Sequence, residues 1–583
     1  MVSLEMTVKQ NTMLASLLVA AVLFFGILYL TKPDHMMVAG GTESDFATTA
    51  EQNPVDTEDN AGISDGNESI EHATDEIALL IVGMLTQIER QTQIDGMLIA
   101  ELESGVYSFE YPLVVVDPYG VSPLTALVLF TSDEPLNISV HVPGKTERSD
   151  VYFTVSGFNT NHQISIYGLY PGILNKVELV ATALDGFTQN IRLEIQTDPL
   201  PFELAKNIII TNLPQPNNYQ PGFNFTFVQK SAFDVNGDYR WFHNDFRTWQ
   251  SVLYDYDGNM VFTSGDDYEG EMLLFTINTL GKVLNVYFLP YGAHHDVTAI
   301  DNGNLLITGS KGDTIEDFIY ELDMETGQIV NTLDLKYVLQ RTRASKITEH
   351  STIDWFHHNA TVYDDGYIII SGRHQSAVAK LSWPDGKLEW ILSDHIGWNP
   401  MFQKYLLTPI GHDFEWSYGQ HAPKILPDFD NNPDTIDILL FDNGNNRFEH
   451  NRGLQLAVAN NEVLLPENYS RMVHYRINEK TRQIEQIWQF GKELGETYFA
   501  YARSDARLLE NGNRLGTFNS YMTNFIEVDP MGNIVWEAYA TSTDHLGSYT
   551  AYRLERLPLY TAAANDLQIG VSARVFIPED KMP

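Results

Sequence analysis

The chain has 583 residues, of which 43% are hydrophobic, and this length is too great for one ordinary core, so more than one domain is expected. The formal net charge of −41 argues against nucleic-acid binding, because that function requires clustered Lys and Arg against the phosphates. The absence of cysteine excludes disulfides, thiolate nucleophiles, zinc-thiolate sites and iron-sulfur clusters.

The N-terminal region contains an apolar run of 18 residues without charge, from Met13 to Leu30. This length is at the lower edge of a membrane span and exceeds most signal-peptide cores, and no Ala-x-Ala cleavage site follows. We therefore expect residues 1–35 to form an uncleaved membrane anchor, with a cleaved signal peptide as the alternative. Either interpretation predicts an extracytoplasmic protein, in the periplasm or at the cell surface.

An acidic segment and a helical pattern follow the apolar run. Between Thr42 and Glu76 there are 11 acidic residues and no Lys or Arg, which predicts a solvated, disordered linker over residues 36–76. Apolar residues then recur at helical spacing and predict an amphipathic helix over residues 77–104. Its apolar stretch is too short to cross a bilayer, so we expect it to pack on a core or to pair with a partner subunit.

Residues 105–200 alternate short β-rich runs with turn residues such as Tyr170-Pro171-Gly172, a pattern that is typical of a small β-sandwich. From residue 201 onward, two sets of hairpin turns alternate, and two hairpins per unit describe four-stranded antiparallel sheets. The first set is Asn236-Gly237, Leu280-Gly281, Thr326-Gly327, Asp385-Gly386, Lys480-Thr481 and Met531-Gly532. The second set is Gly258-Asn259, Gly303-Asn304, Asp365-Gly366, Gly444-Asn445 and Gly512-Asn513.

The six members of the first set predict a six-bladed β-propeller over residues 201–583, so the whole chain is expected to be all-β behind its N-terminal helix. The spacing of the turns is widest between Asp385 and Lys480. Long insertions are therefore expected to leave the ring in that part of the chain.

Histidines and one arginine gather where strand patterns of this region begin or end. The innermost strands of a propeller line its central channel, so these clusters are expected to meet in one pocket. The guanidinium of Arg373 is a planar set of donors suited to a tetrahedral oxyanion, and a neutral imidazole is a competent nucleophile near pH 7. The three clusters are His294-His295-Asp296, then His357-His358-Asn359 followed by Ser371-Gly372-Arg373-His374-Gln375, then Gly419-Gln420-His421.

The first two clusters have the same form, two histidines followed by Asp or Asn and an alternating strand. Because side chains of a strand alternate between its faces, one histidine of each pair is expected to face the channel. Aligning the two runs pairs His294 with His357 and Asp296 with Asn359. His295 is the alternative to His294.

Several segments resemble the bacterial arylsulfate sulfotransferases, which are exported enzymes that do not use phosphoadenosine phosphosulfate. The resemblance extends from about Tyr107 to the C-terminus. It rests on residues 117–127 and 168–171 in the expected sandwich, and on residues 354–359, 371–377, 419–421 and Tyr552-Arg553 in the expected propeller.

The resemblance implies a ping-pong transfer of a sulfuryl group from a phenolic sulfate ester to a phenol through a transient sulfohistidine, without cofactor or metal. By motif match, His421 is the nucleophile, and His357 and Arg373 bind the sulfuryl group. His294 is the best match for the remaining histidine, with His295 as the competing choice.

Asn359 is implied as a supporting donor in the substrate site. The acid that protonates the leaving phenolate is His294 or His357, because charge gathers on the bridging oxygen as the ester bond breaks. The family's tendency to dimerise implies a homodimer, and contact with the membrane is expected only through the N-terminal helix.

Two other classes of function use the same residues. A metal-dependent propeller hydrolase or lyase would take His294, His357 and His421 as ligands, although the guanidinium of Arg373 would repel the ion. A surface-anchored binding propeller would have no catalytic activity. The Asp428–Asp434 segment resembles a calcium loop in composition but lacks the Gly and the closing Glu, which favours a solvated turn.

Overall fold

The computed structural model describes residues 67–201, 208–214, 218–226, 230–244, 252–256, 259–266, 270–343, 346–347, 353–445, 447, 469–520, 522–541, 551–560 and 569–582. The expected anchor over residues 13–30 lies outside the described residues, and so do residues 36–66 of the acidic linker. Within the described ranges, every helix is too short or too polar to cross a membrane.

Helix α2 spans Asn67–Glu103 and contains most of the helix predicted for residues 77–104. Residues 67–76, which we predicted to be linker, are helical. Acidic composition alone does not distinguish a linker from the first turns of a helix, where negative charge is compatible with the helix dipole. The helix serves core packing, one of its two expected uses, because Ile81 and Leu98 are buried in the same apolar core as the strands that follow.

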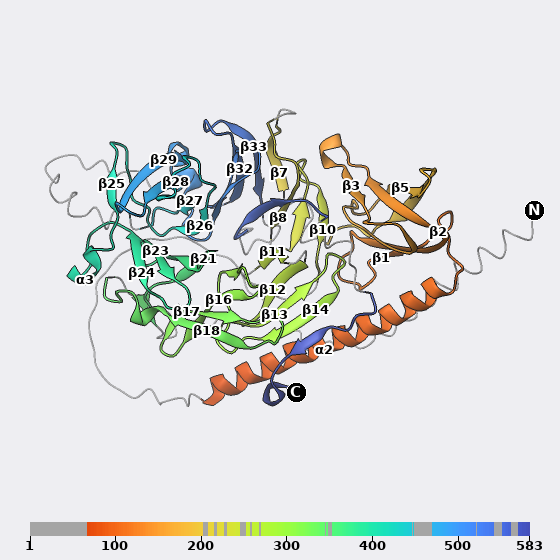
Figure 1. Ribbon diagram of the computed structural model, residues 1–583, viewed down its shortest axis with the longest axis horizontal. Coiled ribbons are helices and arrows are strands. Elements are labelled where there is room, and N and C mark those ends of the chain that lie inside the picture. Colours follow the sequence, from red (N-terminus) through yellow and green to blue (C-terminus); the bar gives the residue numbers. More distant parts are fainter. Residues whose placement is uncertain are drawn as a thin grey trace, which may run out of the picture. The chain divides into compact units, whose positions relative to one another are not determined.

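A buried ion pair fastens α2 to the sheets. Asp95 accepts a hydrogen bond from Nζ of Lys282 at 2.6 Å, and both side chains are at most 5% exposed. The same carboxylate accepts from the hydroxyl of Tyr119 at 2.8 Å and from the backbone N–H of Gly570 at 2.9 Å. Figure 1 shows α2 running beside strands β14 (Val283–Phe288) and β35 (Arg574–Phe576).

The first sheet is built around the long strand β2, and the two halves of this strand pair with different neighbours. Its residues 126–131 pair with β4 and 126–129 also with β1, whereas residues 136–142 pair with β3 and β5. The pairing changes at a register shift between Thr131 and Leu136. The strands are β1 (Leu113–Val116), β2 (Ala126–Val142), β3 (Val151–Thr154), β4 (Asn159–Ile166), β5 (Leu174–Ala183) and β6 (Thr188–Gln196).

The described strands after residue 200 form six further sheets of four to six strands each. The first three are β10-β9-β8-β34, β11-β12-β13-β14-β35 and β15-β16-β17-β20-β19, with β18 paired to β17. Their strands are β8 (Phe223–Thr226), β9 (Ser231–Phe233), β10 (Tyr239–Phe242), β34 (Leu554–Leu557), β11 (Val252–Tyr256), β12 (Asn259–Asp266), β13 (Gly270–Ile277), β15 (Val297–Ala299), β16 (Leu305–Lys311), β17 (Thr314–Leu322), β18 (Ile329–Asp334), β19 (Lys346–Ile347) and β20 (Ile353–Asp354).

The other three sheets have the orders β21-β22-β23-β24, β25-β29-β28-β27-β26 and β30-β31-β32-β33-β7. A short helix, α3 (Pro400–Gln403), follows β24. The strands are β21 (His358–Asp364), β22 (Tyr367–Gly372), β23 (Ala377–Ser382), β24 (Leu388–Leu392), β25 (Thr408–Ile410), β26 (His421–Ile425), β27 (Thr435–Asp442), β28 (Arg471–Asn478), β29 (Gln483–Phe490), β30 (Asp505–Leu508), β31 (Arg514–Asn519), β32 (Thr523–Val528), β33 (Ile534–Ala540) and β7 (Ile208–Asn212).

The predicted turns occupy distinct places in these sheets. Each turn of the first set joins two antiparallel strands late in its sheet, as Asn236-Gly237 does between β9 and β10. Of the second set, Gly303-Asn304, Asp365-Gly366 and Gly512-Asn513 lie between two early strands, and Gly258 lies outside the described residues. Gly444-Asn445 was wrongly predicted as a hairpin turn. It follows β27, and Gly444 is required there because a Cβ would lie 2.3 Å from the backbone oxygen of Tyr469.

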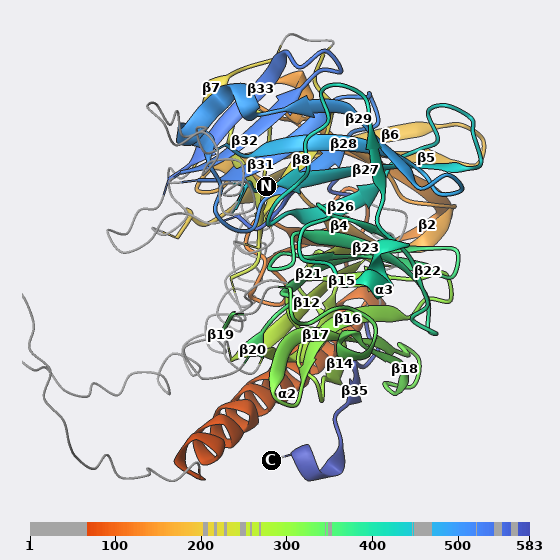
Figure 2. The ribbon, with the colours of Figure 1, turned by 90° about the vertical axis from the view of Figure 1, so that its left-hand side faces the viewer.

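Strands from distant parts of the chain belong to three of the six sheets. β34, near the C-terminus, pairs antiparallel with β8, and β7, the first described strand after residue 200, pairs antiparallel with β33. β35, also near the C-terminus, pairs parallel with β14. Figure 2 shows β7 and β33 side by side. Sequence-distant pairing of this kind joins the beginning of the region to its end.

We expect Asp95→Ala to destabilise the protein by about 3–5 kcal/mol, because it leaves the buried ammonium of Lys282 without its carboxylate. Urea unfolding followed by circular dichroism measures the change. Glu89→Gln, at an exposed position of the same helix, is the matched control and should change the free energy of unfolding by less than about 0.5 kcal/mol. Equal stability of Asp95→Ala and the unaltered protein would contradict this account.

Candidate active site

The three histidine clusters come together because the strands that carry them start side by side. His421 begins β26, and His357 immediately precedes β21, whose first two residues are His358 and Asn359. The side-chain amide of Asn359 donates to the backbone oxygen of Gln420 at 2.8 Å, which links these two sheets. The backbone N–H of Thr361 donates to Asp296 at 3.0 Å, which links the second sheet to the first cluster.

His421 is buried and held through one ring nitrogen. Its Nδ1 lies 2.7 Å from Oδ1 of Asn443 and 3.1 Å from the backbone oxygen of Gly419. The side-chain nitrogen of Asn443 donates to the backbone oxygens of Ala500 and Arg503, so its Oδ1 must face the histidine. Two acceptors around Nδ1 require that this nitrogen carry the proton. The neutral ring therefore presents an unprotonated Nε2, which is the nucleophilic tautomer.

Burial and the neighbouring positive charges keep His421 neutral. The pKa of His421 is well below its ordinary value, first because of burial and then because of the charges on Arg373, His295 and His357. The hydrogen bond to Asn443 opposes this shift and does not reverse it.

The backbone before His421 is fixed from several sides. Gly419 has a φ of +62°, and a Cβ there would lie 2.8 Å from the Cβ of Asn445, so glycine is required. The side-chain amide of Gln420 donates to the backbone oxygens of Gly372 and Ala377, and its backbone oxygen accepts from Asn359. Asn359, which we predicted to support the substrate, thus uses its side-chain N–H group to position the strand of His421.

His357 has the opposite electrostatic environment. Its Nδ1 lies 2.6 Å from a carboxylate oxygen of Asp354 and 2.7 Å from one of Glu316. Burial alone would lower the pKa of His357, but these two carboxylates raise it to about 9. His357 is therefore an imidazolium at neutral pH, with Nδ1 held by the carboxylates and Nε2 available as a donor.

Arg373 lies beside His357 because the two backbones are in contact. The N–H of Arg373 donates to the backbone oxygen of His357 at 3.1 Å, and a Cβ on Gly372 would lie 2.3 Å from the ring of Phe356. The guanidinium of Arg373 packs over the ring of Tyr501 with a distance of 4.9 Å to its centroid. The backbone of the Ser371-Gly372-Arg373 segment is therefore fixed beside His357, and the positive charge of Arg373 acts on His421.

The structure places His295, and not His294, against the other site residues. The ring of His295 lies 4.8 Å from that of His357 between centroids, and its Nδ1 is 3.3 Å from the hydroxyl of Tyr552. His295 and His357 both have positive φ, +56° and +55°, so these two are equivalent in backbone conformation. Our alignment of His294 with His357 was wrong by one residue, because the left-handed turn of the chain was not visible in the sequence.

The side chain of His294 lies at the edge of the histidine cluster, next to Ser310 and Glu316. Its Nε2 lies 3.2 Å from the hydroxyl of Ser310, and its Nδ1 is 3.7 Å from Glu316. Burial lowers the pKa of His294 to about 4, so it is neutral at physiological pH. Its neighbour Asp296 pairs with Arg553 at 2.6 Å.

Two other residues of the clusters have structural roles. His358 is fully buried, and its Nε2 bonds to the backbone oxygen of Ala360 at 2.9 Å. Gln375 donates to the backbone oxygen of Trp355 at 2.9 Å. The Asp428–Asp434 segment lies in the hairpin between β26 and β27.

Sequence reasoning missed Asn443, Asp354 as a partner of His357, and Glu316. Asp354 belongs to the segment 354–359 that carries the family resemblance, but nothing in the sequence shows that its carboxylate contacts the side chain of His357, three positions later. Asn443 and Glu316 are distant in sequence from the histidines they contact. No local pattern marks either of them.

Two groups of side chains among the described residues have ligand atoms close enough for a metal ion, namely His295-Glu316-His357 and Asp354-His357-His374. His294 and His421, which the metal hypothesis requires as ligands, belong to neither group. The carboxylates of these two groups, Glu316 and Asp354, already have a role without a metal ion, because they stabilise the positive charge of His357.

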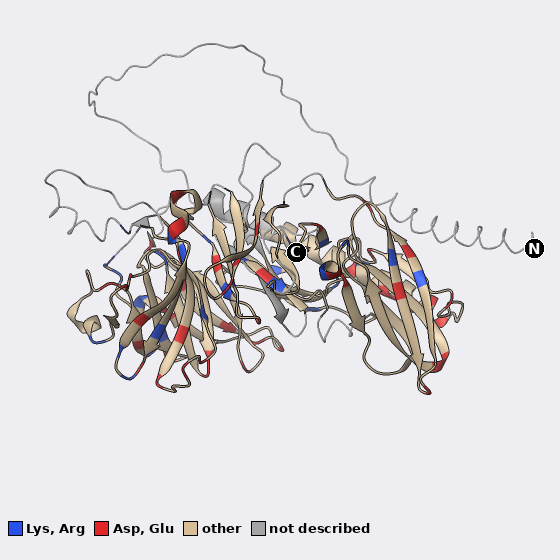
Figure 3. Cartoon of the chain, turned by 90° about the horizontal axis from the view of Figure 1, so that it is seen from above, with Lys and Arg blue, Asp and Glu red and all other residues tan. Residues whose placement is uncertain are grey.

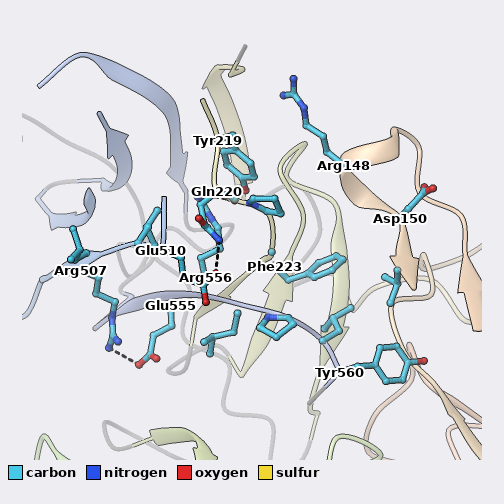
Figure 4. Close-up of a pocket in the computed structure, with 18 of the residues that line it drawn as sticks. Arg148, Asp150, Tyr219, Gln220, Phe223, Arg507, Glu510, Glu555, Arg556 and Tyr560 are labelled. Atoms are coloured by element: carbon cyan, nitrogen blue, oxygen red, sulfur yellow. Dashed lines mark hydrogen bonds and ion pairs between the residues drawn. The ribbon is translucent and has the colours of Figure 1, made fainter. Parts of the chain in front are cut away.

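A separate cavity of about 1170 Å³ lies at the other end of strand β26 from His421. Tyr219, Phe223, Lys424, Arg507 and Arg556 are among its lining residues, and Figure 4 shows the ion pair of Arg507 with Glu555 at its edge. The histidines of the three clusters are absent from its lining. This cavity is distinct from the candidate active site.

Comparison with known families identifies the proteins to which this chain is related. A sequence model described as "Arylsulfotransferase (ASST)" matches residues 212–553, more than half of the chain, and one described as "Arylsulfotransferase Ig-like domain" matches residues 113–198. The chain belongs to the arylsulfotransferase family. This result confirms the resemblance found in the sequence, and it identifies an aryl-sulfate sulfotransferase.

Individual relatives of the sulfotransferase are distant in sequence. Arylsulfate sulfotransferase AssT of Lelliottia amnigena is 26% identical over 512 residues, which cover 66% of this chain and 81% of that protein. The protein of the same name from Escherichia coli O6:H1 is 24% identical over 532 residues, which cover 70% and 84%.

Solved structures resemble the sulfotransferase only weakly. The Kuenenia stuttgartiensis hydrazine synthase has a TM-score of 0.28 at 10% identity and covers 51% of this chain and 67% of its own. The Dos1 propeller has a TM-score of 0.26 at 8% identity, with 55% and 67% covered. At such scores neither likeness supports an argument.

For the sulfotransferase we expect opposite titrations of two histidines in NMR spectra of histidine-labelled protein. His357 should titrate near pH 9, and His421 should stay neutral far below pH 6.5. A raised pKa means that His357 adds stability that is fully present below pH 6.5 and is lost as the pH rises through about 9. The lowered pKa of His421 means that stability falls as the pH drops below 6.5, because the unfolded chain takes up a proton there and the folded protein does not.

Asp354→Asn should lower the pKa of His357 because it removes one of the two carboxylates at Nδ1. A His357 resonance that titrates below 6.5 in the unaltered protein would contradict the described geometry.

Proposed function

We propose that the sulfotransferase uses His421 as the nucleophile of a ping-pong reaction, in which a sulfuryl group moves from a phenolic sulfate ester to a phenol through a sulfohistidine. One observation carries the proposal: the buried ring of His421 holds its proton on Nδ1 against Asn443, which leaves the Nε2 lone pair for attack. The neighbouring cations supply the charges that a sulfate monoester needs.

In the first half-reaction, Nε2 of His421 attacks sulfur, so that an N–S bond forms as the bond from sulfur to the phenolic oxygen breaks. The electron pair of the broken bond stays on the phenolic oxygen, which takes the Nε2 proton of His357. Arg373 binds the oxygens of the sulfuryl group. Because Nδ1 of His421 keeps its proton, the sulfated ring is a cation and remains a good leaving group.

In the second half-reaction, the hydroxyl of the incoming phenol gives its proton to Nε2 of His357 as its oxygen attacks sulfur. The N–S bond breaks, and its electron pair returns to Nε2 of His421. Both residues are then in their initial states. The same histidine thus serves as acid and then as base, as microscopic reversibility requires.

His295 takes the place in this scheme for which His294 was the first choice. Its ring contacts both His357 and Tyr552, and it lies on the charged side of the cluster next to Glu316. We propose that His295 supports the charge of the bound sulfuryl group, while His294 supports the cluster from the side through Glu316.

We propose that the six sheets after residue 200 are the blades of a six-bladed β-propeller, preceded by a β-sandwich. The pairing of β34 with β8 and of β7 with β33 supports this proposal, because strands from the two ends of the region would close a ring. A closed ring explains how strands from three sheets start at one site.

We propose further that residues 13–30 anchor the enzyme to a membrane and keep the catalytic part outside the cytoplasm. The uncharged run of 18 apolar residues supports this. Carbonate extraction of membranes from producing cells tests it. Release of the full-length chain into the soluble fraction would contradict an anchor.

Incubation of the enzyme with an aryl sulfate and no acceptor should leave a sulfuryl adduct on the peptide that contains His421. Mass spectrometry of a rapid-quench sample, together with the burst of released phenol, measures it. His421→Ala should show neither the adduct nor turnover, because no other nucleophile faces the sulfur in this scheme. The exposed His395→Asn is the matched control and should keep both.

Turnover by His421→Ala, or an adduct on a different histidine, would contradict the proposal. Binding of aryl sulfates without any turnover in the unaltered enzyme would favour the non-catalytic binding protein. Loss of activity in the presence of a chelator would favour the metal-dependent alternative.

A further inference from the structure

Glu316 is a buried acid that takes no direct part in the two half-reactions. Its side chain is 10% exposed, and its carboxylate lies between two histidines of the site. One oxygen is 2.7 Å from Nδ1 of His357 and 3.1 Å from Nε2 of His295. Burial favours the neutral acid, but electrostatic interactions with His295 and His357 outweigh it and hold the pKa of Glu316 well below its usual value. Glu316 is therefore ionised at neutral pH.

The backbone at Glu316 is distorted in a way that directs this side chain. Glu316 has a φ of +54°, a strained conformation that a glutamate rarely adopts. The register between β16 and β17 shifts between Gly309 and Lys311, where the irregularity lies opposite Glu316. The N–H of Glu316 donates to the hydroxyl of Ser310 at 3.0 Å, which holds the distortion. Such irregularities commonly redirect a side chain next to an active site.

Glu316 and Asp354 converge on the same atom. Nδ1 of His357 has one hydrogen, and two carboxylate oxygens lie within 2.7 Å of that nitrogen. This pair of charges fixes the Nδ1 proton and stabilises the second proton, which must be on Nε2. Nε2 is consequently the ring atom of His357 that exchanges a proton with a substrate.

We propose that Glu316 is a positioning residue that, together with Asp354, keeps His357 charged and aimed so that its Nε2 proton is delivered to the departing phenolic oxygen. This inference rests on the proposed function of the site. It explains why a strained acid is retained beside the histidines. It also predicts that Glu316 matters most for donors whose phenolate needs a proton to leave.

The acidity of His357 matches this task. A pKa of about 9 is close to that of an ordinary phenol, which is about 10. Proton transfer between the two groups is then nearly balanced in both directions, as a residue that acts first as acid and then as base requires. An aliphatic alcohol is a far weaker acid, so the pair of carboxylates favours phenols as donors and acceptors.

The test compares two donors in the phenol-release burst of Glu316→Gln. Phenyl sulfate has a basic leaving group that needs the proton, and its burst rate should fall by about 100-fold, the lower end of what positioned proton transfer contributes. The burst rate with 4-nitrophenyl sulfate should stay nearly unchanged, because its electron-poor phenolate leaves without protonation. A structural defect would lower both rates together.

Two further variants complete the experiment. Asp354→Asn should show the same dependence on the leaving group, since it removes the other carboxylate from Nδ1. Glu321→Gln is the matched control, because this buried acid lies on the same strand but accepts from Asn302, Asn304, Asn331 and Trp383. It should keep the unaltered ratio of the two burst rates.

An unchanged ratio in Glu316→Gln, with an intact adduct on His421, would overturn the role of Glu316 and leave the proposed function standing. Absence of the adduct in the unaltered enzyme would instead overturn the proposed function. If Glu316→Gln does not fold, the ratio in Asp354→Asn decides, and an unchanged ratio there overturns the inference.

Discussion

The hydrogen bond between Nδ1 of His421 and Oδ1 of Asn443 is the contact on which the chemistry of the site depends. If the amide of Asn443 faced the ring with its nitrogen, the proton would move to Nε2, and the proposed nucleophile would lose its lone pair. The bonds from Asn443 to the backbone oxygens of Ala500 and Arg503 prevent that rotation. His421 pairs with Phe441 across the sheet, so the register of β26 against β27 brings the histidine to the amide.

Two histidines of one site have opposite charge states because their partners differ. His421 bonds to neutral oxygens and lies near cations, and both its burial and those charges favour the neutral ring. His357 is also largely enclosed, but two carboxylates outweigh the cost of burial. In a medium of low dielectric such differences are large, and they separate a neutral histidine, the proposed nucleophile, from a charged one, the proposed acid.

The strong negative charge of the chain does not prevent a site for anions. Acidic and basic residues are interspersed over the described sheets, so the negative charge is dispersed (Figure 3). Near the histidines, the carboxylates of Glu316, Asp354 and Asp296 each contact a cationic group. These acids therefore stabilise the positive groups that a sulfate ester would meet.

The sequence by itself determined the family, the all-β class and the segments that carry the site, because His421, Arg373 and the residues around His357 lie in short motifs with fixed local spacing. It did not determine which of His294 and His295 faces His357. That choice depends on a residue with a left-handed backbone conformation, which an alternating pattern of side chains does not reveal. The sequence also did not identify Asn443 and Glu316 as residues of the site. Their contacts join separate strands, and only tertiary packing decides which side chains from different strands share one buried space. These neighbours in turn decide which histidine is neutral and which is charged.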